Sequence, residues 1–125
     1  MQKIIIPLAL LALAVGCGGV DATPVDQNHS GTLADGATQH GGRTCDTYPI
    51  TLGRGWHVTA EMTSEWDNYL YLAKLEDVAS NDDTNGTNAR IDTAVEESGS
   101  YSVYACAYSD GRGPYTLRIT TRAGD

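Results

Sequence analysis

Residues 66–83 read WDNYLYLAKLEDVASNDD. Between residues 68 and 75 tyrosines alternate with leucines, and almost every position is apolar or aromatic. A strand that is apolar on both faces belongs inside a sheet, with a neighbouring strand on each side. We place Leu75 with the other leucines, on the apolar side of this strand. A short turn, a second short strand and a polar, acidic loop follow, so this stretch predicts a β-sheet protein.

The rest of the chain reads as further short strands. Tyr101, Val103 and Ala105 alternate with Tyr104 and Cys106, which is the period of two that is typical of a β-strand. Turn-forming residues recur at roughly every 8 to 12 positions, and no helical period follows the N-terminal segment. The pattern predicts an all-β fold, an antiparallel β-sandwich of seven or eight short strands. Seven strands are expected at residues 31–33, 46–52, 56–64, 68–75, 89–95, 98–108 and 113–120. One more short strand is expected after the turn that follows residues 68–75.

Two segments carry local signals. Residues 35–44, DGATQHGGRT, contain three glycines and are expected to form a turn-rich loop. Pro49 lies inside a predicted strand but has no backbone N–H to donate to a neighbour. We therefore expect the sheet edge, or a bulge, at Pro49.

The N-terminus is typical of an exported protein. Residues 1–16 join a basic start to an apolar run too short to span a bilayer, as in a secretory signal peptide. The run ends in AVGC, small residues before a cysteine as in a bacterial lipobox, which predicts lipidation of Cys17. The alternative is an ordinary signal peptide that leaves Cys17 as a free thiol. Residues 17–30 show no hydrophobic period and are expected to form a flexible tether, and Gly18 suggests the outer membrane.

The net charge limits the classes of binding partner, and the number of cysteines predicts a disulfide. Loss of residues 1–16 removes one lysine and no acid, so the net charge falls from −8 to −9. An acidic surface repels nucleic acid and anionic lipid, which excludes both as expected partners. If Cys17 carries lipid, Cys45 and Cys106 remain as a pair, and an exported protein meets an oxidising compartment. They are expected to form a disulfide that ties a sheet face or edge; the alternative is two separately buried thiols.

The ordered set of motifs resembles the bacterial pre-peptidase C-terminal (PPC) domain over residues 31–121. The matching positions are Asp46, Tyr48, Gly55, Asp67, Leu70, Leu72, Asp82, Asp83, Gly99, Tyr101, Val103, Gly113, Tyr115 and Leu117. The resemblance implies a jelly-roll-like β-sandwich in residues 31–125, non-catalytic and usually attached after a secreted peptidase. It also implies that some members bind matrix polymers such as collagen, sometimes with calcium. Here no peptidase precedes the domain, so we expect a stand-alone module with an adhesion, binding or envelope accessory role.

Calcium has a candidate loop. The loop that begins at Asn81 approaches the spacing of the oxygen ligands in an EF-hand calcium loop. It departs from that pattern because its first position is Asn, its twelfth, Asp92, is Asp, and no helices flank it. The loop positions are Asn81, Asp82, Asp83, Asn85 and Asp92. In an alternative set, closer to the resemblance, Asp67 joins Asp82 and Asp83. A third interpretation is a hairpin loop whose Asp and Asn side chains cap their own backbone.

Catalysis finds little support. The sequence has no G-x-S-x-G and no H-E-x-x-H motif, and His29, His40 and His57 are far apart along the chain. A hydrolase would need a concave site that joins His40 or His57 to a serine and an aspartate. We therefore expect no enzyme activity and keep an unrecognised hydrolase as the third hypothesis.

Tyrosine is the remaining signal. The chain has seven tyrosines, two tryptophans and no phenylalanine, and amphipathic rings on a sandwich face can stack on sugars or hold peptides. Four tyrosines fall off the predicted core faces and are the expected ligand-binding residues: Tyr69, Tyr71, Tyr104 and Tyr108. The sequence predicts a lipid-anchored, non-catalytic module that binds an extracellular polymer or an envelope protein. The alternative is a structural spacer, or an accessory subunit of a secreted peptidase system.

Overall fold

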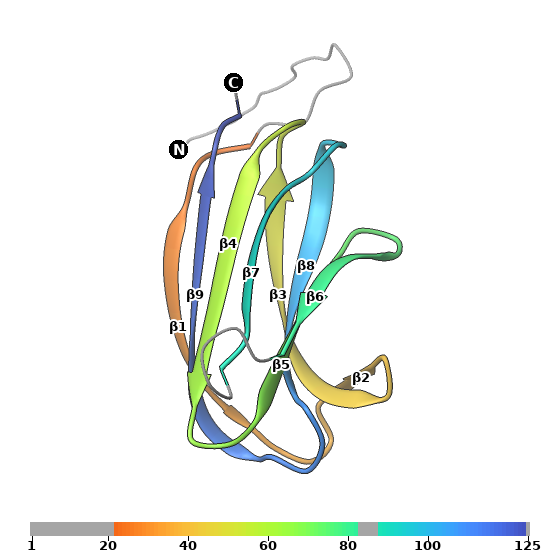
Figure 1. Ribbon diagram of the computed structural model, residues 1–125, viewed down its shortest axis with the longest axis vertical. Coiled ribbons are helices and arrows are strands. Elements are labelled where there is room, and N and C mark those ends of the chain that lie inside the picture. Colours follow the sequence, from red (N-terminus) through yellow and green to blue (C-terminus); the bar gives the residue numbers. More distant parts are fainter. Residues whose placement is uncertain (1–21, 83–87, 125) are drawn as a thin grey trace, which may run out of the picture.

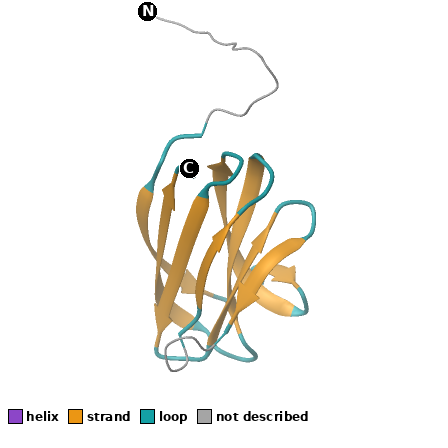
Figure 2. Ribbon diagram, turned by 45° about the horizontal axis from the view of Figure 1, so that its top comes forward, coloured by secondary structure: helices purple, strands orange, loops and turns teal. Residues whose placement is uncertain are grey.

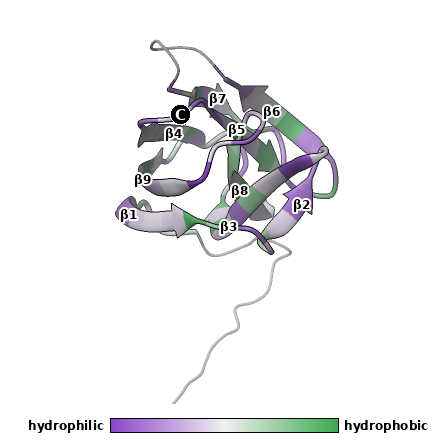
Figure 3. Cartoon of the chain, turned by 90° about the horizontal axis from the view of Figure 1, so that it is seen from below, coloured by the Kyte–Doolittle hydropathy of each residue, from purple (hydrophilic) through white to green (hydrophobic). Residues whose placement is uncertain are grey.

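The structure is a computed structural model that describes residues 22–82 and 88–124 (Figure 1). Two antiparallel sheets pack face to face, and the described residues contain no helix (Figure 2). The strands are β1 (Asp26–Leu33), β2 (Thr38–His40), β3 (Arg43–Leu52), β4 (His57–Ser64), β5 (Asn68–Ala73), β6 (Asp77–Asn81), β7 (Arg90–Ala94), β8 (Gly99–Ala107) and β9 (Gly113–Arg122). One sheet has the order β1-β9-β4-β7 and the other β2-β3-β8-β5-β6. Seen along the strands in Figure 3, these two sets face each other, which confirms the predicted all-β sandwich.

The structure corrects the predicted number of strands and the predicted start of the fold. The described residues form nine strands instead of seven or eight, because β2 lies inside residues 35–44 and pairs with the start of β3. β1 begins at Asp26, so residues 26–30 belong to the sandwich and not to the predicted tether. Their side chains are polar, and the strand is held by its pairing with β9, which a hydrophobic pattern does not reveal.

β5 is an interior strand, as predicted. It pairs with β8 on one side and with β6 on the other. Leu70 and Leu72 lie in the core between the sheets, and Tyr71 belongs to a second buried cluster on the opposite face of the same sheet. The two apolar faces of β5 therefore serve two separate clusters.

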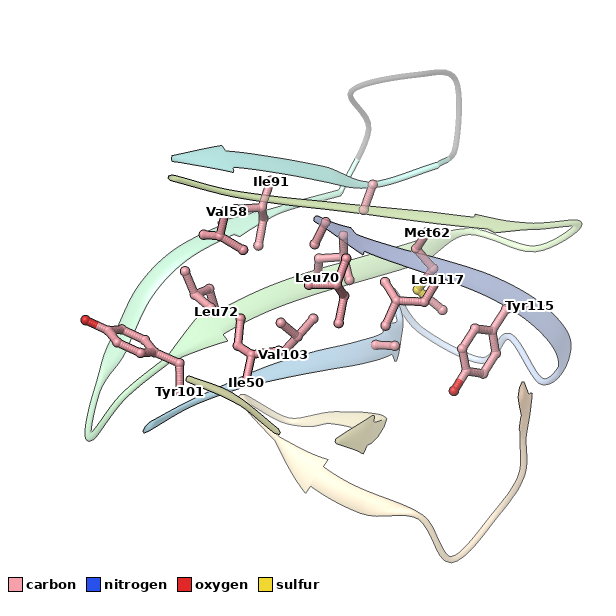
Figure 4. Close-up of a cluster of buried hydrophobic side chains, with 14 of the residues drawn as sticks. Ile50, Val58, Met62, Leu70, Leu72, Ile91, Tyr101, Val103, Tyr115 and Leu117 are labelled. Carbon is pink, nitrogen blue, oxygen red and sulfur yellow. The ribbon is translucent and has the colours of Figure 1, made fainter. Parts of the chain in front are cut away.

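The main core fills the space between the sheets (Figure 4). Two tyrosines lie at its opposite ends in Figure 4: the hydroxyl of Tyr101 points outward, and the hydroxyl of Tyr115 points across toward the facing sheet. Tyr101 donates to the backbone oxygen of Glu97 at 2.5 Å, and Tyr115 donates to Oδ2 of Asp46 at 2.5 Å. Each ring thus fills core volume while its hydroxyl is hydrogen-bonded at the edge of the core.

Pro49 lies at an open sheet edge, as predicted. β3 pairs with β8 through this position, but β2 covers β3 only from Arg43 to Cys45. Beyond that point no described strand pairs with the open side of β3, so the missing N–H of Pro49 breaks no ladder bond there.

The predicted signal peptide, residues 1–16, and the predicted lipidation site, Cys17, lie outside the described residues. Within the part of the chain that the structure describes, no helix is long and apolar enough to cross a membrane.

Candidate binding face on the five-stranded sheet

The four tyrosines predicted to bind a ligand come together on one surface. Alternation along β5 and β8 turns them away from the core, onto the outer face of the five-stranded sheet. Tyr69 and Tyr71 have ring centroids 4.8 Å apart, and Tyr69 and Tyr108 have centroids 6.2 Å apart. Tyr104 lies directly opposite Tyr71 in the pairing of β5 with β8. We call this surface, with the two residues described next, the tyrosine face.

Arg43, at the start of β3, completes one side of the tyrosine face. Its guanidinium carbon lies 4.1 Å from the ring centroid of Tyr69 and 5.0 Å from that of Tyr108. Its Nη1 donates to the Tyr71 hydroxyl at 2.9 Å. A guanidinium over aromatic rings is attracted by their π-electrons, so Arg43 fixes the positions of three tyrosines.

His40, at the end of β2, completes the other side. Its ring stacks on Tyr104 with centroids 3.9 Å apart and meets Tyr71 edge-on at 4.6 Å. His40 Nε2 lies 2.7 Å from Oδ1 of Asp77, the first residue of β6. The β2–β3 hairpin therefore folds against the tyrosines and connects across them to the far edge of the sheet.

The tyrosine face is partly open to solvent. Tyr71 is 6 % exposed beneath the hairpin, whereas Tyr108 is 42 % exposed. Tyr69 and Tyr104 have intermediate exposure. A ligand that approaches this surface would meet the rings of Tyr108, Tyr69 and Tyr104 beside one arginine.

The predicted disulfide between Cys45 and Cys106 is present. Both cysteines lie on the outer face of the sheet, beneath the tyrosine face, and neither is exposed. The bridge joins neighbouring strands β3 and β8, so it ties a sheet face, as predicted, and does not cross between the sheets. It fits an exported protein, because such bonds persist in oxidising compartments.

The sequence reasoning missed Arg43 and His40. Both lie in or beside residues 35–44, which were expected to be a loop. The available signal was the pair Gly41-Gly42: both have positive φ, 60° and 80°, as a tight hairpin turn requires. A two-residue glycine turn between short extended runs predicts a hairpin.

The histidines do not assemble a hydrolase site within the described residues. His40 is bonded to Asp77, but no described serine hydroxyl bonds to His40 or to His57. The groove described below, between β6 and β7, includes neither histidine.

The calcium candidates are spread out. Asp92 pairs with Arg90, with Oδ2 and Nη2 3.4 Å apart, and Asn81 accepts a hydrogen bond from the Arg90 backbone. Asp67 precedes β5, and its buried Oδ1 has no hydrogen-bond partner among the described residues. Asp82 ends the described part of this loop, and the remaining candidates, Asp83 and Asn85, lie outside the described residues. Within the described residues no three His, Cys, Asp or Glu side chains gather as a metal site, and the calcium loop stays a prediction.

Comparison with solved structures supports the fold. The PPC domain of a collagenase from Bacillus anthracis matches with a TM-score of 0.58 and 18 % identity, covering 76 % of this chain and 89 % of that one. The PliG protein of Aeromonas hydrophila, a periplasmic inhibitor of g-type lysozyme, matches with a TM-score of 0.56 and 16 % identity, covering 88 % and 93 %. PliG of Salmonella Typhimurium matches with a TM-score of 0.56 and 18 % identity, covering 82 % of this chain and 93 % of that one. No family model and no curated protein matches the sequence. The resemblance to the PPC domain is thus confirmed at the level of the fold.

Proposed function

We propose that this chain is an exported, non-catalytic binding module that holds a protein or an extracellular polymer on its tyrosine face. One observation carries the proposal: the four tyrosines that face away from the main core converge on one sheet face. The proposal includes a lipid anchor on Cys17 and attachment to the outer membrane, which rest on the sequence alone.

The chemistry of the tyrosine face suits binding. Aromatic rings with a polar tip bury a large area at a small loss of conformational entropy, and they accept both apolar and hydrogen-bonding partners. Arginine and tyrosine are also the residue types most enriched among side chains that dominate binding energy. Tyr108 and Arg43 supply this combination side by side, 5.0 Å from ring centroid to guanidinium carbon.

A protein partner is favoured over a polymer by the comparisons. Two of the solved structures with this fold are described as inhibitors of a lysozyme, so the fold supports protein recognition in those proteins. A structural spacer has no need of exposed aromatic residues. The 42 % exposure of Tyr108 therefore favours the binding module over the spacer.

A pull-down tests the proposal. The mature chain is immobilised and challenged with envelope extract of its own cells and with a panel of matrix polymers, in calcium and in chelator. We expect retention of a defined component, and we expect Tyr108→Ser to reduce it about ten-fold, the effect of losing one well-packed anchor. Retention that disappears in chelator would support the calcium loop.

Leu75→Ser is the matched control, because Leu75 is an exposed apolar side chain at the tip of the β5–β6 hairpin, away from the tyrosine face. It should leave retention on the tyrosine face unchanged. Loss in Leu75→Ser alone would assign the retained component to the groove described below, and equal loss in both variants would contradict the tyrosine face as the binding surface. No retention in either buffer would contradict the proposal and favour the spacer.

A further inference from the structure

A groove of about 700 Å³ lies on another side of the molecule, between the two sheets. Among the described strands, β6 pairs only with β5, and β7 only with β4, so each is the edge strand of its sheet. In Figure 1 β7 and the β5–β6 hairpin diverge toward the hairpin tip. The groove opens between them, with the end of β7 on one wall and the hairpin on the other.

The hairpin wall carries apolar side chains that the fold leaves in water. Leu75 at the tip is 97 % exposed, and Val78 on β6 is 48 % exposed. Both line the groove. The sequence placed Leu75 on the apolar side of its strand, but the turn carries it away from the core. The described residues include only one other exposed large hydrophobic side chain, Tyr108 on the tyrosine face.

The rim of the groove is acidic. Among the described residues, Glu76 on the hairpin and Glu96 and Glu97 on the loop after β7 line it against a single cation, Lys74. Asp77 also lines it and is bonded to His40. Lys74 Nζ lies 3.1 Å from Oε1 of Glu97, so the only lysine of the groove is already paired. The field in the groove is therefore negative and attracts a cationic partner.

The floor of the groove is the inner side of the sandwich. Tyr101, 4 % exposed, closes the end of the core there, and Figure 4 shows its hydroxyl directed outward. A groove with an aromatic floor, apolar side chains on one wall and strand edges along both sides accepts an extended chain, because edge strands present unpaired backbone groups.

We propose that this groove binds an extended, lysine- or arginine-rich segment of a partner protein, with Leu75 as its apolar anchor. The segment lies between the edges of β6 and β7, where its backbone can pair and its basic side chains reach the acidic rim. A second copy of this chain is a poor occupant, because the mature chain carries a net charge of −9 after loss of Lys3 from the −8 of the whole sequence. The inference does not rest on the tyrosine face, although the two surfaces adjoin at Asp77, which lines the groove and is bonded to His40.

Fluorescence anisotropy with a labelled octapeptide of alternating lysine and valine tests the inference on the full mature chain. We expect saturable binding that Leu75→Ser weakens and that Glu76→Lys with Glu96→Lys weakens about ten-fold. Glu61→Lys with Glu65→Lys, on β4 and the turn after it, is the matched charge control and should change the affinity less than about two-fold. Tyr108→Ser should bind the peptide as the native chain does.

Two further peptides test the mode of binding. A peptide of alternating glutamate and valine should not bind, and the lysine peptide with N-methylated valines should bind about ten-fold more weakly, because it cannot pair with a strand edge. Absence of binding by the lysine peptide, or equal weakening by the two charge-reversal pairs, would overturn the proposal. Undiminished binding of the N-methylated peptide would overturn the strand-edge mode. If the peptide fails to bind but the pull-down still retains a component, the groove proposal fails and the tyrosine face stands. If the peptide binds but the pull-down retains nothing, the tyrosine face fails and the groove proposal stands.

Discussion

Cys45 and Cys106 lie directly opposite each other on β3 and β8, with their Cα atoms 4.0 Å apart. The two cysteines are 61 positions apart in the sequence, and their bridge joins two strands that are already hydrogen-bonded neighbours. It lies under Tyr71 and the β2–β3 hairpin, on the face of the sheet away from the main core. The tyrosine face is thus built on a covalent cross-link.

Removal of the bridge should destabilise the fold strongly. A loop of this length corresponds to about 4 kcal/mol in the chain-entropy model, so Cys45→Ala with Cys106→Ala should lower the free energy of unfolding by about 2–4 kcal/mol. Urea unfolding followed by circular dichroism, compared with the oxidised native chain, measures the difference. A double variant within about 0.5 kcal/mol of the native chain would contradict this prediction.

Tyr115 makes the sandwich sensitive to alkaline pH. Burial raises the pKa of Tyr115 above its usual value of 10.0, and its hydrogen bond to the Asp46 carboxylate raises it further. In the unfolded chain the hydroxyl ionises near pH 10, whereas in the folded chain it keeps its proton. Stability from this group is therefore complete below pH 10 and is lost as the pH rises above it, by up to about 1.4 kcal/mol per pH unit.

Tyr115→Phe separates the loss of the hydrogen bond to Asp46 from the effect of ionising the Tyr115 hydroxyl. At pH 7 the variant should be about 1–3 kcal/mol less stable, because the Asp46 carboxylate loses a hydrogen-bond donor. Above pH 10 the native chain loses stability through Tyr115 and the variant does not, so the difference between them should narrow. Urea unfolding at several pH values between 7 and 11 follows this difference, and a constant gap would refute the argument.

Gly41 allows the hairpin to close over the tyrosine face. A Cβ atom at Gly41 would lie 2.5 Å from the Tyr71 hydroxyl, whereas a Cβ at Gly42 would meet nothing within 4 Å. Both glycines have positive φ, so Gly42→Ala carries only the backbone strain and is the matched control. Gly41→Ala should be less stable than Gly42→Ala by about 1–3 kcal/mol and should change the near-ultraviolet circular dichroism of the tyrosines. Identical stability of the two variants would contradict this prediction and show that the Tyr71 side chain shifts away from the new methyl group at no cost in stability.

The alternation of side chains explains why so much of the fold was predictable. Tyr101, Val103 and Ala105 all point into the core from β8, and Tyr104 and Cys106 point to the opposite face. Because a strand alternates strictly, assigning one face to the core assigns the other face as well. The position of the disulfide and the shared face of the four tyrosines followed from this rule.

The missed features depend on contacts between distant segments. Asp26 to Ser30 is polar, and its strand conformation comes from pairing with β9, more than 80 positions later in the chain. Arg43 and His40 reach the tyrosines only because the hairpin folds onto the sheet. Leu75 is exposed because the hairpin turns at that point, and its apolar character alone predicts the opposite.

The lipid anchor is testable on the whole precursor. Small residues before Cys17 predict that the thiol is acylated after export and that the chain is then cut directly before Cys17. Cys17→Ser should therefore move the protein from the detergent phase to the aqueous phase in Triton X-114 partitioning and abolish incorporation of labelled fatty acid, because it removes the thiol that would carry the acyl chain. The variant keeps Cys45 and Cys106, so its domain should unfold at the same temperature as the native domain. Detergent-phase partitioning that survives the substitution would mean that residues 1–16 are not removed or that another contact holds the chain on the membrane, and the predicted anchor would be wrong.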